Sequence, residues 1–249
     1  MDRRGEIMNK NFLFWKLIWK LSANYMPEKL RKKIRWQIAH EDEKRFWLNL
    51  PEVEFQAQAV GYRNLAEQIL ERLQARLKCG ENFKALQIGC AVEDAIFYFP
   101  YGQLHAIDPL ANFYKANFKK SNNPKVDYRQ ASGEKIPFPN SYFDLIICQN
   151  VIDHVMDCNR VLNEIKRTLK SNGIVYFGVD VYPPEIARLR GEYQIKNIIF
   201  DVQHPHTFTV ESFEKLTDEN SFNVIERYPM QPSGKGDESE RYCVYVTQV

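Results

Sequence analysis

The sequence predicts an α/β fold built on a doubly wound, mostly parallel β-sheet. Short apolar runs at 85–88 and 104–107 end abruptly, the first at Gly89 and the second at Asp108. Buried parallel strands end in this way before a tight turn. Apolar segments of strand length then alternate with segments of helical periodicity, and this alternation is typical of a parallel sheet covered by helices on both faces.

The segment before this alternation is helical and interrupted by proline. An apolar run at 12–21 comes first. A charged helix is then expected at 27–48 and another at 54–78. Pro51 separates these two helices, and Gly80 should end the second.

The elements of the sheet follow in order. Strands are expected at 85–88, 104–107, 126–129, 143–148, 174–179, 223–228 and 241–247. Helices are expected at 92–97, 110–118, 159–169 and 210–219, with Asp157 capping the third. Only a polar loop at 231–240 lies between the last two strands, so they must pair antiparallel.

Charge divides the chain into an N-terminal helical extension, residues 1–50, and a main domain, residues 51–249. Residues 1–35 hold ten Lys/Arg and three Asp/Glu, a net charge of +7, which leaves −5 for the rest of a chain whose total is +2. A mildly acidic main domain does not resemble a phosphate-binding surface, so we expect no nucleic-acid partner.

The five cysteines are scattered and none forms a CxxC pair. This excludes a disulfide framework and a zinc site of recognised spacing, and it favours a reducing cytoplasmic setting. Cys90 and Cys148 lie at strand ends, where we interpret them as small buried hydrophobic residues.

The apolar run at 12–21 surrounds most of a helix, with Lys16 and Lys20 in a narrow stripe. It is too short and too charged to span a bilayer. Two alternatives stay open. Residues 8–35 could contact an anionic membrane surface peripherally, or the run could cap a cleft of the main domain or of a partner subunit.

The turns after the first two strands predict a ligand site. Gly89 lets the main chain approach a ligand, and the expected helix behind it would present free N–H groups. An acid such as Asp108, at the tip of the neighbouring strand, can accept both hydroxyls of a ribose. Together they predict a pocket for a nucleoside-bearing cofactor.

From residue 86 to about 246 the chain resembles the class I S-adenosylmethionine-dependent methyltransferases of the small bacterial type. The resemblance is carried by 86–91 (LQIGCA), 106–109 (AIDP), 133–145 (GEKIPFPNSYFDL), 151–155 (VIDHV), 162–165 (LNEI) and 169–173 (LKSNG). It implies a seven-stranded sheet whose last strand inserts antiparallel. It also implies S-adenosylmethionine as cofactor, bound across the carboxyl ends of the first, second and fourth strands.

The resemblance also implies a set of cofactor-binding residues: Gln87, Gly89, Cys90, Ala91, Asp108, Pro109, Ser132, Gly133 and Gln149. Asp108 would bind the ribose diol, with a helix cap before Pro109 as the alternative. The sequence departs from the family pattern at three positions. Gln87 replaces an acid, and Ala91 and Glu93 replace glycines, so that Glu93 would push the loop outward or face solvent.

Methyl transfer to an oxygen requires alignment of the reactants and removal of a proton, for which histidine is the natural base. His154 follows Asp153 after the fourth strand, where the reaction centre should lie; its alternative role is a turn residue satisfied by the backbone. His206 lies in 203–209, a segment that commonly closes over the acceptor in this fold. Both are predicted to be catalytic. No metal site is predicted, because Asp153, His154 and His206 have no recognised ligand spacing.

The sequence therefore predicts an S-adenosylmethionine-dependent methyltransferase that acts on a small-molecule or saccharide-type acceptor, with O-methylation favoured. The N-terminal helices and an insertion at 182–200 would select the acceptor. A non-catalytic nucleoside-binding scaffold derived from such an enzyme is the alternative. A nicotinamide-dependent oxidoreductase fits less well, because its phosphate loop needs three spaced glycines and Val92-Glu93-Asp94 stand here instead.

Overall fold

The computed structural model describes residues 3–196, 198–199, 201–229 and 241–248. The chain begins with three helices: α1 (Arg3–Ser22), α2 (Glu28–Asn49) and α3 (Glu52–Leu73). Pro27 precedes α2 and Pro51 precedes α3, as proline does where a helix begins. Helix α3 ends five residues before the predicted end at 78, because a turn after Leu73 directs Leu77 into the core.

A seven-stranded sheet follows, as predicted. Its strands are β1 (Lys84–Ile88), β2 (Gln103–Asp108), β3 (Val126–Gln130), β4 (Phe143–Gln149), β5 (Leu169–Val181), β6 (Asn223–Pro229) and β7 (Arg241–Gln248). Their order is β3-β2-β1-β4-β5-β7-β6. Strand β7 pairs antiparallel with β5 and with β6, while the other pairs are parallel. The predicted antiparallel insertion of the last strand is confirmed. The predicted loop at 231–240 lies outside the described residues.

Four further helices connect the strands: α4 (Ala111–Asn117), α5 (Cys158–Thr168), α6 (Pro184–Ile195) and α7 (Val210–Glu219). Asp157 caps α5 as predicted, by accepting a hydrogen bond from the Arg160 N–H. Strand β5 begins at Leu169, directly after α5, and a bulge opposite Phe143 and Leu145 absorbs its early start.

The helix predicted at 92–97 is wrong. The chain forms only a short 3-10 turn, η2, at Ala95–Tyr98. Asp94 accepts a hydrogen bond from the Ala95 N–H, and Gln87 accepts one from the Ile96 N–H, so two side chains take up the donors of this turn. The helix α3, which precedes β1 in the sequence, packs against η2 in place of the missing helix.

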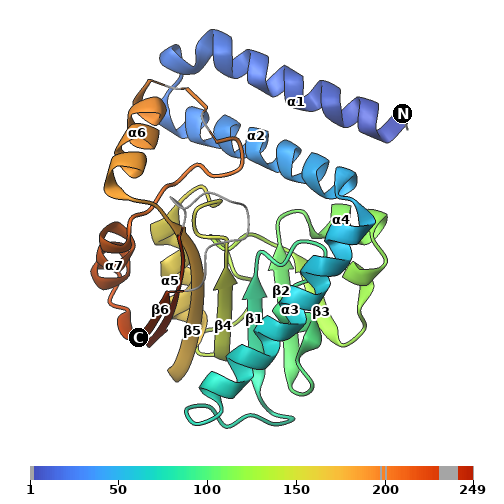
Figure 1. Ribbon diagram of the computed structural model, residues 1–249, viewed down its shortest axis with the longest axis vertical. Helices are drawn as coiled ribbons and strands as arrows, with labels where there is room; N and C mark the ends of the chain where they lie inside the picture. Colours follow the sequence, from blue (N-terminus) through green and yellow to red (C-terminus); the bar gives the residue numbers. More distant parts are fainter. Residues whose placement is uncertain (1–2, 197, 200, 230–240, 249) are drawn as a thin grey trace.

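The three N-terminal helices are arranged above and in front of the sheet (Figure 1). Helix α2 crosses the carboxyl ends of the parallel strands, and α1 lies along the far side of α2. Phe12 of α1 packs against Ile34 and Ile38 of α2. The two helices therefore cover the edge of the sheet at which doubly wound α/β folds bind their ligands.

Candidate functional site

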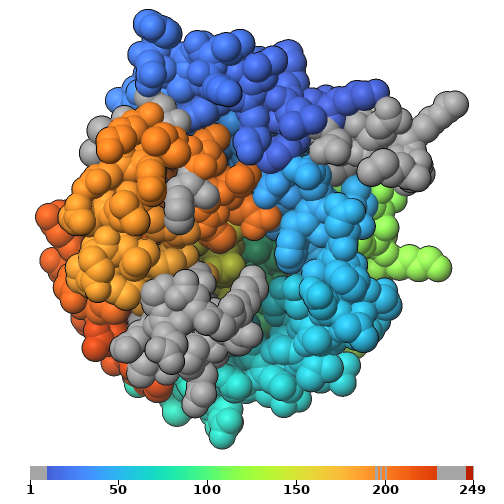
Figure 2. Space-filling view, turned by 45° about the horizontal axis from the view of Figure 1, so that its top comes forward, coloured from blue at the N-terminus to red at the C-terminus, as the bar shows by residue number. Residues whose placement is uncertain are grey.

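A cavity of about 690 Å³ opens at the carboxyl ends of the strands. The loops after β1, β2, β3 and β4 line one side of it, and α2, α6 and the segment 201–204 line the other. Figure 2 shows a hollow between the cyan N-terminal helices and the orange segment that contains α6. Most residues predicted to bind a cofactor line this cavity: Gly89, Cys90, Ala91, Asp108, Pro109, Ser132, Gly133 and Gln149.

The loop after β1 brings the main chain to the cavity through two left-handed residues. Gly89 has a φ of +66° and Ala91 a φ of 45°. A Cβ at Gly89 would lie 2.4 Å from Cγ2 of Val151, so only glycine fits between the two loops. The Gly89 N–H donates to the Ile107 carbonyl at 2.8 Å, which ties this loop to β2.

The Asp108 carboxylate joins two loops beside the cavity. It does not cap α4, whose N-cap is Leu110: its Oδ1 accepts the Leu110 N–H at 2.7 Å in the turn before that helix, and its Oδ2 accepts the Ala91 N–H at 3.0 Å. The carboxylate also lines the cavity. Burial raises the pKa of Asp108 to about 7, although these two N–H groups act to lower it. Asp108 therefore lies beside the glycine loop and offers further acceptor sites to a ligand.

Gln87 does not line the cavity. Its side chain is fully buried beneath the loop, where its Oε1 accepts the Ile96 N–H at 2.9 Å. The prediction that Gln87 touches the cofactor is therefore corrected: it positions the loop. Asp94 lines the cavity instead, and burial raises its pKa to about 7.

Glu93 neither pushes the loop outward nor faces solvent. It is buried and pairs with Lys120 at 2.8 Å, and the Tyr98 hydroxyl donates to it at 3.2 Å. The Ser121 hydroxyl donates to the Val92 carbonyl in the same place. The family's third glycine is thus replaced by an ion pair that fastens the back of the loop.

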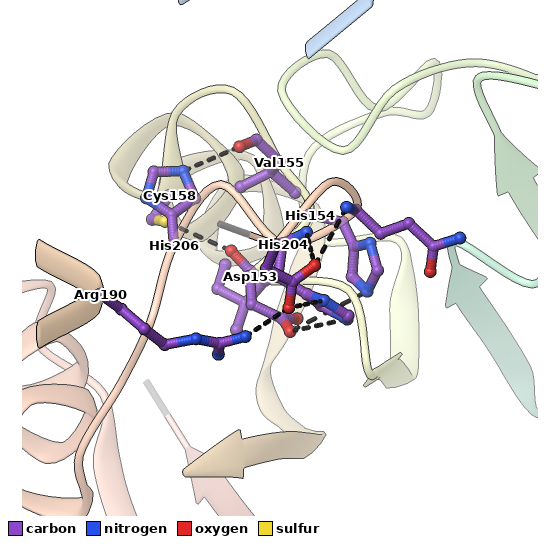
Figure 3. A network of polar contacts seen from close by, with 10 residues as sticks. Asp153, His154, Val155, Cys158, Arg190, His204 and His206 are labelled. Carbon is purple, nitrogen blue, oxygen red and sulfur yellow. Dashed lines mark hydrogen bonds and ion pairs between the residues drawn. The ribbon is translucent and has the colours of Figure 1, made fainter. Parts of the chain in front are cut away.

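Three side chains meet on the far side of the cavity and form what we call the Asp153 cluster: Asp153, His154 and His204. The Asp153 Oδ2 lies 3.8 Å from His204 Nε2 and 3.9 Å from His154 Nε2. The two imidazole ring centroids are 4.3 Å apart. Figure 3 shows both rings close to the Asp153 carboxylate.

Asp201 holds His204 in place. Its Oδ2 accepts the His204 Nδ1–H at 2.7 Å and also pairs with Arg190. Burial acts to lower the pKa of His204, but the hydrogen bond to Asp201 and the charges of Asp153 and Asp201 outweigh it and raise that pKa. Burial acts to raise the pKa of Asp201, yet His204 and Arg190 hold it below its usual range.

His206, predicted to be catalytic, does not line the cavity. Its Nε2 lies 2.8 Å from the Val155 carbonyl, to which it donates (Figure 3). His204, two residues earlier, occupies the place expected for His206, so the prediction is corrected at that position. His154 lines the cavity as predicted.

A family model described as a methyltransferase domain matches residues 86–177, the segment from β1 into β5. The order of the strands and the position of the cavity agree with that match. Over residues 86–177 the chain is therefore a segment of the methyltransferase-domain family.

The relatives of this methyltransferase domain differ in the atom that they methylate. An uncharacterized methyltransferase, YcgJ of Bacillus subtilis, is 25% identical over 57% of this chain and 58% of its own length. A ubiquinone biosynthesis O-methyltransferase of Rhodopseudomonas palustris is 32% identical over 45% of this chain and 46% of its own. The chain spans about half the length of the curated relatives it matches.

A solved structure shows the same fold. Geranyl diphosphate C-methyltransferase from Streptomyces coelicolor, in complex with Mg²⁺, geranyl diphosphate and S-adenosyl-L-homocysteine, superposes with a TM-score of 0.53 at 12% identity. The match covers 74% of this chain and 79% of that one. At this identity the similarity concerns the fold of the methyltransferase domain alone.

Sequence reasoning expected the N-terminal helices to select the acceptor, but it did not identify which residues of α2 line the cavity. Trp36, His40, Glu43 and Trp47 all line the cavity from this helix. The His40 ring packs at a tilt against Trp36, with ring centroids 3.7 Å apart, and burial lowers the pKa of His40 to about 3, so the ring is neutral. The spacing of these four residues, by three or four positions, places them on one helical face and could have indicated a shared environment.

Proposed function

We propose that this protein transfers a methyl group from S-adenosylmethionine to a small-molecule acceptor. One observation carries the proposal: Gly89, Asp108 and Gln149, at the carboxyl ends of β1, β2 and β4, line a single cavity. Ligands of doubly wound sheets bind at this edge. The methyltransferase names of the relatives, and the S-adenosyl-L-homocysteine in the structural neighbour, support the choice of cofactor.

The residues that line the cavity fit this cofactor. Gly89 lets the main chain lie against the ligand, and the Asp108 carboxylate can accept two ribose hydroxyls. Ser132 and Gly133 would flank the adenine. The buried Oε1 atoms of Gln58 and Gln149, which have no hydrogen-bond partner among the described residues, also belong to this lining. A polar ligand would satisfy them.

Asp94 and Gln58 would hold the amino-acid end of the cofactor. The family's acid within the first motif is Gln87 here, but Asp94 returns a carboxyl group to the cavity a few residues later. The Asp94 carboxylate can therefore serve as the anionic partner of the cofactor's ammonium group, although the usual acid of the first motif is Gln87 here.

The Asp153 cluster lies where an acceptor would lose its proton. The bound cofactor supplies an activated methyl group, so the chain has to align the acceptor, exclude water and take charge of that proton. The acceptor side of the cavity combines polar residues, Arg190, Gln203 and His204, with apolar ones such as Trp36, Ile186 and Leu189. The polar residues favour a hydroxyl-bearing, saccharide-type acceptor and O-methylation.

Titration calorimetry tests the proposal directly. We expect saturable binding of S-adenosylmethionine and of its demethylated product, and no binding of NAD. An absence of saturable binding of the first two compounds would refute the proposed function. Binding without methylation across a broad panel of hydroxyl-bearing acceptors would instead identify a nucleoside-binding scaffold.

The affinity for S-adenosylmethionine should rise with pH up to about 7, the pKa of Asp108, and then level off. Two ribose hydroxyls that donate to Asp108 favour the ionised carboxylate, so binding is coupled to loss of a proton, with at most about a tenfold change per pH unit. Calorimetry over this pH range measures the effect. Asp108→Asn should remove the part of this pH dependence that Asp108 causes. Asp94→Asn should remove the part caused by Asp94, the second carboxyl group whose pKa is raised.

The stability of the ligand-free protein should depend on pH in the opposite direction to the affinity for S-adenosylmethionine. Aspartate in an unfolded chain has a pKa of about 3.9. The folded value of about 7 is higher, so the protonated form stabilises the fold. That stability is present below the unfolded pKa and is lost as the pH rises through about 7.

We also propose that α1 lies on an anionic membrane surface. Leu13, Phe14, Leu17 and Leu21 are between 54% and 68% exposed, while Phe12 faces α2. An apolar stripe on a segment with a net charge of +7 favours anionic lipid as its partner. Within the described ranges, no helix has the length and apolar character that crossing a bilayer would require.

Co-sedimentation with vesicles tests this membrane contact. We expect binding to phosphatidylserine-containing vesicles that weakens as salt is raised, and little binding to phosphatidylcholine alone. Replacing Leu13 and Leu17 with glutamine should abolish it, whereas replacing the exposed Val53 of α3 should not. If the variant with glutamine at positions 13 and 17 sediments with phosphatidylserine-containing vesicles as the parent does, the proposed membrane contact of α1 is contradicted.

A further inference from the structure

We propose that the Asp153 cluster is a binding site for a single divalent transition-metal ion, with Asp153, His154 and His204 as ligands. Each of the three offers one ligand atom, and these atoms lie within 4.8 Å of one another. Ligands of a tetrahedral site with bonds of about 2.1 Å are roughly 3.4 Å apart, so a small contraction, by rotation of the two rings, closes the site.

Two buried atoms of the cluster have no hydrogen-bond partner among the residues that the structure describes. They are the Asp153 Oδ1 and the His154 Nε2, and Asp153 is only 2% exposed. Buried polar atoms are rarely left unsatisfied. A shared cation would satisfy the His154 nitrogen and neutralise the buried carboxylate.

His204 has the outer partner that metal-binding histidines usually have. Its Nδ1–H donates to Asp201, which leaves the lone pair of Nε2 directed toward Asp153. Asp201 is fixed in turn by Arg190 and by the Gln203 N–H at 3.1 Å. This is the carboxylate–histidine–metal arrangement, built before any metal arrives.

The backbone fastens together the two loops that supply the ligands. The His206 N–H donates to the Asp153 carbonyl at 3.1 Å, which links the loop after β4 to the segment that carries His204. Because His206 also donates its ring N–H to Val155, its role is to hold this junction. Asp153, His154 and His204 do not form a recognisable sequence motif, because the third ligand comes from another loop.

The ligand set indicates the class of metal. One carboxylate and two imidazoles suit Zn²⁺, Mn²⁺, Fe²⁺ or Co²⁺, whereas Mg²⁺ and Ca²⁺ prefer oxygen ligands. His154 and His204 line the cavity, so a fourth position would face the acceptor. This last step rests on the proposed function. A hydroxyl bound there would lose its proton to water and its oxygen would take the methyl group from the sulfonium, which leaves an ether and a thioether.

Zn²⁺ binding to the full-length, untagged and chelator-treated protein tests the inference. Calorimetry should show one Zn²⁺ per chain, and Co²⁺ should give a visible absorption spectrum when it is added alone. His204→Ala and His154→Gln should each lower the Zn²⁺ affinity more than tenfold, and Asp201→Asn should lower it about 10- to 100-fold. His105→Gln, in β2 and away from the cavity, is the matched control and should bind as the parent does.

The outcomes separate this inference from the proposed function. Circular dichroism establishes that each variant is folded before its affinity is compared. An absence of stoichiometric Zn²⁺ binding by the parent protein would overturn the metal site. So would a Zn²⁺ affinity equal to the parent's in the folded His204→Ala and His154→Gln variants. S-adenosylmethionine binding is measured on the same metal-free samples. If it persists while Zn²⁺ does not bind, the proposed function stands and only the metal site is refuted.

Discussion

Replacing Asp108 with alanine is expected to lower the affinity for S-adenosylmethionine more than tenfold. A hydrogen bond to a charged group contributes about 1.5–3 kcal/mol, and the carboxylate is placed to accept two from the ribose. The substitution also releases the Ala91 and Leu110 N–H groups that the carboxylate now accepts. The site therefore loses a ligand contact, and the glycine loop loses one of its two anchors to the neighbouring strand.

Calorimetry on two Asp108 variants and one control separates these effects. Asp108→Asn keeps a carbonyl oxygen for one backbone N–H, so its loss of affinity should be smaller than that of Asp108→Ala. Asp127→Ala is the matched control, since this carboxylate lies on the neighbouring strand β3 and pairs with His105 and Arg129. Unchanged affinity in Asp108→Ala would remove Asp108 from the cofactor site.

The strands were predictable because each carries its own signal. Ala85, Leu86 and Ile88 are all nearly fully buried, as a run of apolar residues in a parallel strand requires. The failure at 92–97 has a local cause. Val92 and Ala95 are apolar at helical spacing, but the side chains of Gln87 and Asp94 satisfy the backbone there and Pro100 follows closely. Side-chain hydrogen bonds compete with helix formation in this way.

The site was predictable where strand pairing brings its residues together and unpredictable where a distant segment folds back onto it. Gly89 and Asp108 stand at the ends of adjacent strands, so parallel pairing brings them together. His204 reaches Asp153 only because the segment after α6 folds back against the loop that follows β4. His204 and His206 are near neighbours of the same type, and only the side chains that each one contacts distinguish them.

Substituting alanine for Gly89 is expected to lower the free energy of unfolding by about 2–5 kcal/mol. The left-handed backbone costs a residue with a Cβ about 1–2 kcal/mol, and overpacking adds about 1–3 kcal/mol. Here the new Cβ meets Val151 Cγ2 at 2.4 Å, and the bond from the Gly89 N–H to Ile107 limits how far the loop can move. Urea unfolding measures the loss.

A double-mutant cycle with Val151→Ala distinguishes the clash from the backbone strain. Removing the valine methyl groups frees the space but leaves the φ of +66°, so the cycle should show a favourable coupling that restores only part of the stability. Gly61→Ala is the control, because Gly61 lies in α3 with nothing within 4 Å of a Cβ, and it should gain about 0.5–1 kcal/mol. Equal effects at the two glycines would show that the contact between the loops after β1 and β4 does not constrain the site. If only the Gly89 substitution lowers stability, the close approach of these two loops depends on the absence of a side chain at residue 89. The exposure of the main chain to the cavity would then depend on it too.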